Sequence, residues 1–198
     1  MGPSENKTRR VALLGVFTAL AFILGFIESL IPSFTGIPGV KAGFANIVTM
    51  VALYLLNDRY NTLNFVKKRT ARSMSHSPEK YVPSVYSLLS ALGISAARII
   101  LAGLSYSGMS AAIYGLSGAV FSLTVMFFLA RARVFSVTAV SVAGGVAHNL
   151  AQLLLACLML GNAVIYYLPA LIVSGLAAGL IIGIIAALLI NRLSLLAE

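Results

Sequence analysis

The sequence predicts an all-helical, polytopic membrane protein, a six-transmembrane-helix bundle with both chain ends in the cytoplasm. Of its 198 residues, 60% are hydrophobic and only 10% are charged, and the mean hydropathy is +0.98. A soluble domain of this length has too little interior to hide so much apolar surface. Apolar runs of about 20 residues indicate membrane-spanning helices. The two-residue alternation typical of a membrane barrel is absent from the sequence.

Six segments are expected to form the helices: 11–31, 43–56, 85–104, 109–130, 136–160 and 164–190. The second segment is short, and Pro38 and Gly39 before it indicate a bent or partly re-entrant entry. The first is interpreted as a retained helix, because no small-residue cleavage pattern interrupts it. We therefore expect a single integral membrane domain over 1–198, located in the bacterial cytoplasmic membrane.

The positions of the basic residues predict the orientation. If the N-terminus is cytoplasmic, all of the 14 Lys and Arg residues except Lys41 and Arg98 fall in cytoplasmic segments, as the positive-inside rule requires. The segment 57–84 is a basic loop on that side, interpreted as solvated or as docking on anionic lipid or an acidic partner. Topology thus accounts for the net charge of +9, and no nucleic-acid partner is expected.

The fifth predicted span carries polar residues in the middle of apolar sequence. A helix aligns a face with steps of four, three and four residues, made of Ser141, Gly145, His148 and Gln152. Asn149 lies beside this face, and Tyr114 of the fourth span is a weaker candidate for the same lining. Polar side chains in hydrocarbon need partners or a wet cavity. Hydrogen bonding between helices and a ligand site are the two alternatives.

Three ionised residues fall in or beside the predicted hydrocarbon: Glu28, Lys41 and Arg98. A charge at the bilayer centre costs at least about 2.5–3.5 kcal/mol, so these side chains should meet one another or a ligand. One alternative is a structural ion pair of Glu28 with Arg98 or with Lys41. The other is an outward-facing anion pocket, because one acid cannot neutralise two bases.

Small residues predict where helices pack closely. The last span repeats them every four residues, at Gly175, Gly179, Gly183 and Ala187, which favours close helix contact within the chain or with another subunit. Gly15 and Ala19 form a shorter version on the first span.

Several chemistries have no residues to support them. The sequence contains no Asp-rich D-D-x-x-D pair, no Walker A loop and no glycine-rich dinucleotide loop. The sequence shows no recognisable Ser/His/Asp triad or Cys/His pair for nucleophilic catalysis. One cysteine, Cys157, and two distant histidines cannot hold a haem or an iron–sulfur cluster. We therefore expect no cofactor, no metal and no autonomous enzyme.

Five stretches resemble a known family: ESLIP at 28–32, IPGVKAGFANIVTMVALYLL at 37–56, ARIILAGL at 97–104, YGLSGAVFSL at 114–123 and VAHNLAQ at 146–152. These resemble the Gx transporter family, which is labelled heptaprenyl diphosphate synthase component I. That family is similar in size and six-helix layout to the substrate-binding S components of energy-coupling factor transporters. The resemblance covers 11–192 except the loop near 60–85.

The resemblance implies a substrate-binding membrane subunit that takes a small anionic or amphipathic molecule from outside. A membrane coupling subunit with ATPases would supply the energy, docking at Gly15 and Ala19. The expected pocket consists of Glu28, Lys41, Asn46, Arg98, Tyr114, His148, Asn149 and Gln152. Two alternatives stand beside it: a non-catalytic membrane component of prenyl diphosphate or quinone metabolism, and a scaffold of a flavin-linked electron-transfer complex.

Overall fold

The computed structural model describes residues 3–30, 43–56 and 82–196. These residues form six α-helices: α1 (Pro3–Leu30), α2 (Phe44–Leu55), α4 (Val85–Ala102), α5 (Met109–Arg131), α6 (Val137–Leu160) and α7 (Leu168–Leu196). A π-helical turn, η1 (Gly103–Ser107), follows α4, and a 3₁₀ helix, η2 (Asn162–Tyr167), precedes α7. The described residues contain no strand. The predicted all-helical fold is confirmed.

Five of the helices are long and apolar enough to cross a bilayer, and the chain is a multi-pass membrane protein. The exception is α2, whose 12 residues extend about 18 Å at 1.5 Å per residue. The hydrocarbon core of a bilayer is about 30 Å thick. The second helix therefore reaches through only part of the membrane.

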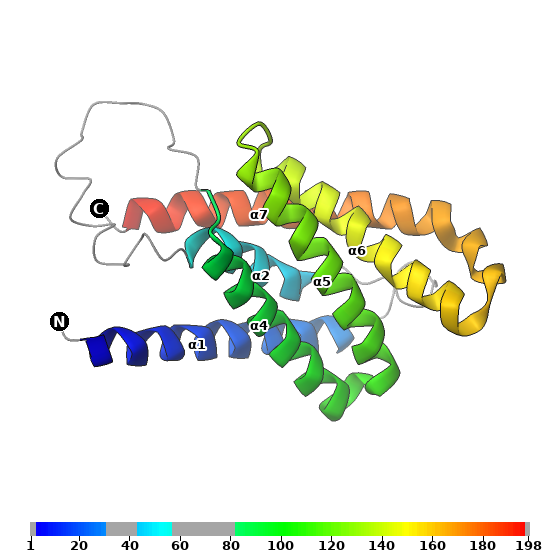
Figure 1. Ribbon diagram of the computed structural model, residues 1–198, viewed down its shortest axis with the longest axis horizontal. Helices are drawn as coiled ribbons and strands as arrows, with labels where there is room; N and C mark the ends of the chain where they lie inside the picture. The colour runs from blue at the N-terminus through cyan, green and yellow to red at the C-terminus, as the bar shows by residue number, and fades with distance from the viewer. Residues whose placement is uncertain (1–2, 31–42, 57–81, 197–198) are drawn as a thin grey trace.

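The short helix α2 lies at the centre of the bundle and packs against α1, α4 and α7. The helices α4, α5, α6 and α7 follow one another as packed neighbours. Figure 1 shows that α1 begins and α7 ends at the same end of the bundle. The main apolar core joins residues of α2 to residues of α5, α6 and α7, including Met50, Leu53, Leu123, Val140 and Ala186.

Local sequence accounts for where the helices begin. The Ser84 hydroxyl accepts a hydrogen bond from the Ser87 amide at 3.2 Å, and Ser136 accepts one from the Ala139 amide at 3.2 Å. These N-caps satisfy amides that have no partner within a helix, so α4 and α6 begin at Val85 and Val137.

Glycines bring α6 and α7 into backbone contact. A β-carbon on Gly179 would lie 2.7 Å from Cα of Val142, and one on Gly183 would lie 2.8 Å from Cα of Thr138. One on Gly145 would lie 2.4 Å from the carbonyl oxygen of Gly175. The glycine repeat of the last span therefore packs within the chain, against α6.

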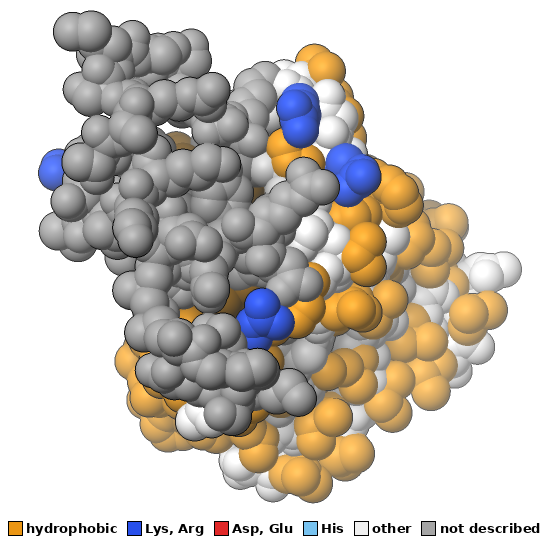
Figure 2. Space-filling model, turned by 60° about the vertical axis from the view of Figure 1, so that its left-hand side comes forward, with side chains coloured by type: hydrophobic (Ala, Val, Ile, Leu, Met, Phe, Trp, Pro, Cys, Tyr) orange, Lys and Arg blue, Asp and Glu red, His pale blue; other side chains and the backbone are white. Residues whose placement is uncertain are grey.

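Exposed basic side chains gather toward the end where the chain termini lie. Arg10, Arg131, Arg133 and Arg192 are all exposed. Figure 2 shows basic side chains on this side of the molecule, above a largely hydrophobic surface. This distribution agrees with the charge asymmetry on which the predicted orientation rests.

Candidate functional site

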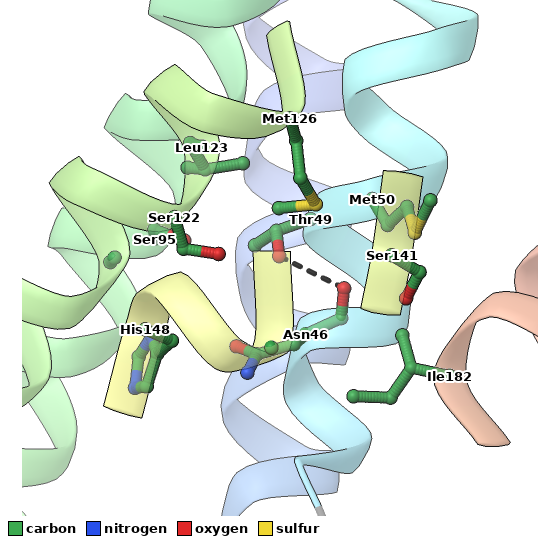
Figure 3. A pocket seen from close by; sticks show the side chains of 12 residues that line it. Asn46, Thr49, Met50, Ser95, Ser122, Leu123, Met126, Ser141, His148 and Ile182 are labelled. Carbon is green, nitrogen blue, oxygen red and sulfur yellow. Dashed lines mark hydrogen bonds between the residues drawn. The ribbon is translucent and has the colours of Figure 1, made fainter. Parts of the chain in front are cut away.

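A cavity with a partly polar lining lies between α2, α4, α5, α6 and α7 (Figure 3). Its polar residues are Asn46, Thr49, Ser95, Ser122, Ser141 and His148, and its apolar ones include Met50, Leu123, Met126 and Ile182. The cavity volume is about 30 Å³, and a water needs roughly 10–15 Å³ on this measure. In the conformation seen here, the cavity has room for a few waters but not for a metabolite.

Arg98 reaches this region from α4. Its Nη2 donates a hydrogen bond to Oδ1 of Asn46 at 2.7 Å, so the guanidinium is attached to the cavity wall. Arg98 does not itself line the cavity. Its Nε is buried and has no hydrogen-bond partner among residues 3–30, 43–56 and 82–196. A buried donor without a partner costs about 1–3 kcal/mol, and more when it carries charge.

Glu28 is buried on α1. Together with Arg98 and Asn46 it forms a polar cluster within the bundle. Its Oε1 accepts a hydrogen bond from the amide of Gly43, the residue that precedes α2. A carboxylate is stabilised at a helix N-terminus, where the helix dipole is positive. Glu28 and Arg98 are close enough to interact electrostatically, but their hydrogen bonds go to Gly43 and Asn46 instead of to each other. The predicted pair of Glu28 with Lys41 involves a residue outside the described ranges.

His148 extends from α6 and packs against α5 at Gly118. A β-carbon on Gly118 would stand 2.6–2.8 Å from three atoms of the His148 ring, so the imidazole rests directly on α5. Gln152, one turn later on α6, places its Nε2 3.1 Å from Nε2 of His148. The structure brings His148 and Asn46 to one cavity. Gln152 does not line this cavity but forms a hydrogen bond with the His148 ring.

The remaining predicted residues lie elsewhere. The amide group of Asn149 donates to the carbonyl of Leu171 at 2.8 Å and to the hydroxyl of Ser174 at 3.1 Å, so it joins α6 to α7 and does not face the cavity. Tyr114 is half-buried on α5 and is not among the lining residues. Gly15 and Ala19 are exposed on α1. Lys41 falls outside the described ranges.

Sequence reasoning missed several contributors to the site, among them Thr49 and Tyr106. Thr49 lines the cavity, and its position one turn after Asn46 could have signalled this. Tyr106 approaches the same position of α1 as Arg98: its hydroxyl and the Arg98 Nη1 lie 3.1 and 3.9 Å from where a Gly25 β-carbon would stand. Its place in a short polar connection gave no such signal.

The described part of the chain brings together no three His, Cys, Asp or Glu residues able to hold a metal ion. What it offers is one buried cation, several hydroxyls, two amide side chains and an imidazole. Such groups recognise an anionic or strongly polar ligand through charge-assisted hydrogen bonds.

Comparison with known protein families gives a match over most of the chain. A family model described as heptaprenyl diphosphate synthase component I matches residues 17–78 and 81–189. No curated protein and no solved structure matches the chain.

Proposed function

Because this chain belongs to the heptaprenyl diphosphate synthase component I family, we propose that it is a substrate-binding membrane subunit. Its substrate would be a small anionic or amphipathic molecule taken up across the cytoplasmic membrane. Separate subunits would supply the energy. The family membership and the membrane-spanning helices support a membrane component, and the polar cluster around Arg98 supports the finer assignment.

The buried guanidinium of Arg98 carries the proposal. Within the described part of the chain its Nε has no hydrogen-bond partner, its Nη2 donates to a neutral amide, and Glu28 accepts a hydrogen bond from the Gly43 amide instead. Ionisable residues inside a membrane are expensive and usually functional. A carboxylate or phosphate at this position would satisfy the unpaired donor and neutralise the charge. The present cavity would have to enlarge to admit such a ligand.

The source of energy follows from what the sequence lacks. Without a nucleotide-binding loop, the chain cannot couple ATP hydrolysis to uptake on its own. The exposed small residues Gly15 and Ala19 of α1 would allow a coupling subunit to approach closely.

Substitution of Arg98 tests the proposal. The wild-type protein, purified in mild detergent, should retain an anionic molecule that mass spectrometry detects. Arg98→Gln should lower its occupancy by about tenfold or more, as expected for losing a charge-assisted hydrogen bond. Arg192→Gln, which removes an exposed charge, should leave occupancy unchanged.

Arg98→Lys separates binding from folding. Lysine keeps the charge but lacks the planar donor fork of arginine, so this variant should fold and bind more weakly than wild type. Wild-type occupancy in folded Arg98→Gln would refute the anion site.

The family description favours a second candidate, a non-catalytic membrane component linked to prenyl diphosphate metabolism. Without an Asp-rich motif to hold magnesium, the chain would bind such a diphosphate and not synthesise it. The identity of the retained molecule distinguishes the two candidates. A lipid-tailed diphosphate supports the second, and a water-soluble anion supports uptake.

A further inference from the structure

The turn η1, which follows α4, carries a tyrosine, Tyr106, that packs against α1. It is a π-helical turn of five residues, Gly103–Ser107, and it ends at Gly108, whose φ is +83°. Turns of this kind are rare and are found frequently at functional sites. Tyr106 lies in this turn, half-buried, so it stands between the bundle and its surroundings.

Two phenylalanines of α1 hold the Tyr106 ring. Its centroid lies 5.8 Å from that of Phe22 and 5.4 Å from that of Phe26, with the Phe26 ring edge-on. Edge-to-face and offset aromatic pairs at such separations stabilise a defined ring orientation. The ring therefore fills the contact between η1 and α1.

The hydroxyl of Tyr106 and the guanidinium of Arg98 both approach Gly25 on α1. The hydroxyl lies 3.1 Å from the point where a β-carbon of Gly25 would stand, and Nη1 of Arg98 lies 3.9 Å from the same point. Gly25 thus leaves room on α1 for both polar groups. The hydroxyl and the guanidinium therefore meet at one position of α1, and the Arg98 Nε has no hydrogen-bond partner among the described residues.

We infer that Tyr106 is a further binding residue of the Arg98 site. It donates its hydroxyl to the anionic group that Arg98 holds, and its ring covers that group on the side of α1. The ligand enters where α1 and η1 separate. This inference rests on the proposed function. It also agrees with the packing of α1, the least buried of the five long helices, with 11% of its apolar span inside the protein against 44% for the span of α4 and η1.

Thiol labelling tests the inference without knowledge of the natural ligand. The single cysteine is removed as Cys157→Ser, and Ser95→Cys then places a buried reporter in the cavity lining. Reagents reach this reporter only when the cavity enlarges, as ligand entry requires, so the absence of labelling in this parent would refute entry of the ligand by this route. The probes are methanethiosulfonate reagents carrying a sulfonate or a trimethylammonium group. Their rates are normalised to those at the exposed reporter Asn162→Cys, which gives a preference for the anionic reagent.

Tyr106→Phe keeps the ring and removes only the hydroxyl, so it should lower this preference by about tenfold, the effect of one hydrogen bond to a charged group. Tyr106→Ala should also raise both labelling rates by about tenfold through the loss of two aromatic contacts. Tyr166→Ala, at an 86% exposed tyrosine, should change neither quantity.

Arg98→Gln in the same background makes the two possible failures distinguishable. If it abolishes the preference while both Tyr106 variants label like their parent, the role of Tyr106 is refuted and the anion site stands. If it leaves the preference unchanged, the anion site is refuted and the role of Tyr106 with it.

Discussion

A hydrogen atom in place of a methyl group at Gly118 allows the His148 ring to lie against α5. An added methyl group would meet three ring atoms at 2.6–2.8 Å, which is well inside van der Waals contact. Gly118→Ala should therefore displace the imidazole, lower the free energy of unfolding by about 1–3 kcal/mol and weaken ligand retention. Thermal unfolding in detergent measures the first effect. Gly93→Ala is the control, because a β-carbon there meets nothing within 4 Å, and equal destabilisation by both variants would contradict the prediction.

The carboxylate of Glu28 should support the site without contacting the ligand. It accepts from the Gly43 amide and offsets part of the Arg98 charge. Glu28→Gln should therefore lower the free energy of unfolding by about 1–3 kcal/mol, while folded protein retains its anionic ligand at least as well as wild type. Occupancy measured on the monodisperse fraction checks this. Loss of the ligand from folded Glu28→Gln would instead make Glu28 part of the binding site.

At the scale of the helix, the contact between α6 and α7 should tolerate no side chain at its glycines. A β-carbon on Gly179 would meet backbone atoms of Val142 and Ser141 at 2.7 and 2.8 Å, and backbone cannot move aside as a side-chain end can. Gly179→Leu should separate the helices and reduce the yield of folded protein in size-exclusion chromatography. Wild-type yield of this variant would show that the helices adjust their crossing freely.

The exposed small residues of α1 should behave differently. A β-carbon on Gly15 meets nothing within 4 Å, so Gly15→Leu should leave the fold intact. If a coupling subunit docks there, the same variant should no longer co-purify with it, because the larger side chain holds the helices apart. Co-purification equal to wild type would exclude Gly15 from that interface.

The helices themselves were predictable, because apolar length alone marks a membrane span. Their ends were less so. The first helix begins at Pro3 instead of 11, since a helix can continue through polar residues beyond the apolar run. The predicted third helix, which was placed over 85–104, changes to a π-helical turn at Gly103.

The site was predictable in part. The cost of polar residues in the membrane pointed to Arg98 and His148, and the family resemblance added Asn46. No local pattern determines a contact between residues 52 positions apart in the chain. Asn149 and His148 are adjacent in sequence, yet one bonds α7 and the other rests on α5. Which neighbour each side of α6 meets depends on helix arrangement, which a single sequence does not encode locally.

For the whole molecule, the distribution of charge predicts the orientation in the membrane. In a background lacking Cys157, an impermeant thiol reagent applied to intact cells should label Ser105→Cys. It should label Arg192→Cys only after the membrane is permeabilised. Both positions are exposed, so access depends on sidedness alone. The reverse labelling pattern would mean that the protein has the opposite orientation in the membrane, with the Arg98 cluster nearer to the cytoplasm.

The short helix α2 has a consequence for how the protein is made. It supplies Asn46 to the proposed site, and it packs against α7, which is translated after the other described helices. Until α7 leaves the ribosome, α2 lacks one of the helices against which it packs. With only 12 residues, α2 is too short to be held stably in the bilayer by its own apolar side chains. Biosynthesis therefore cannot complete the proposed binding site early, and a chain truncated after α6 should be recognised by membrane quality-control proteases.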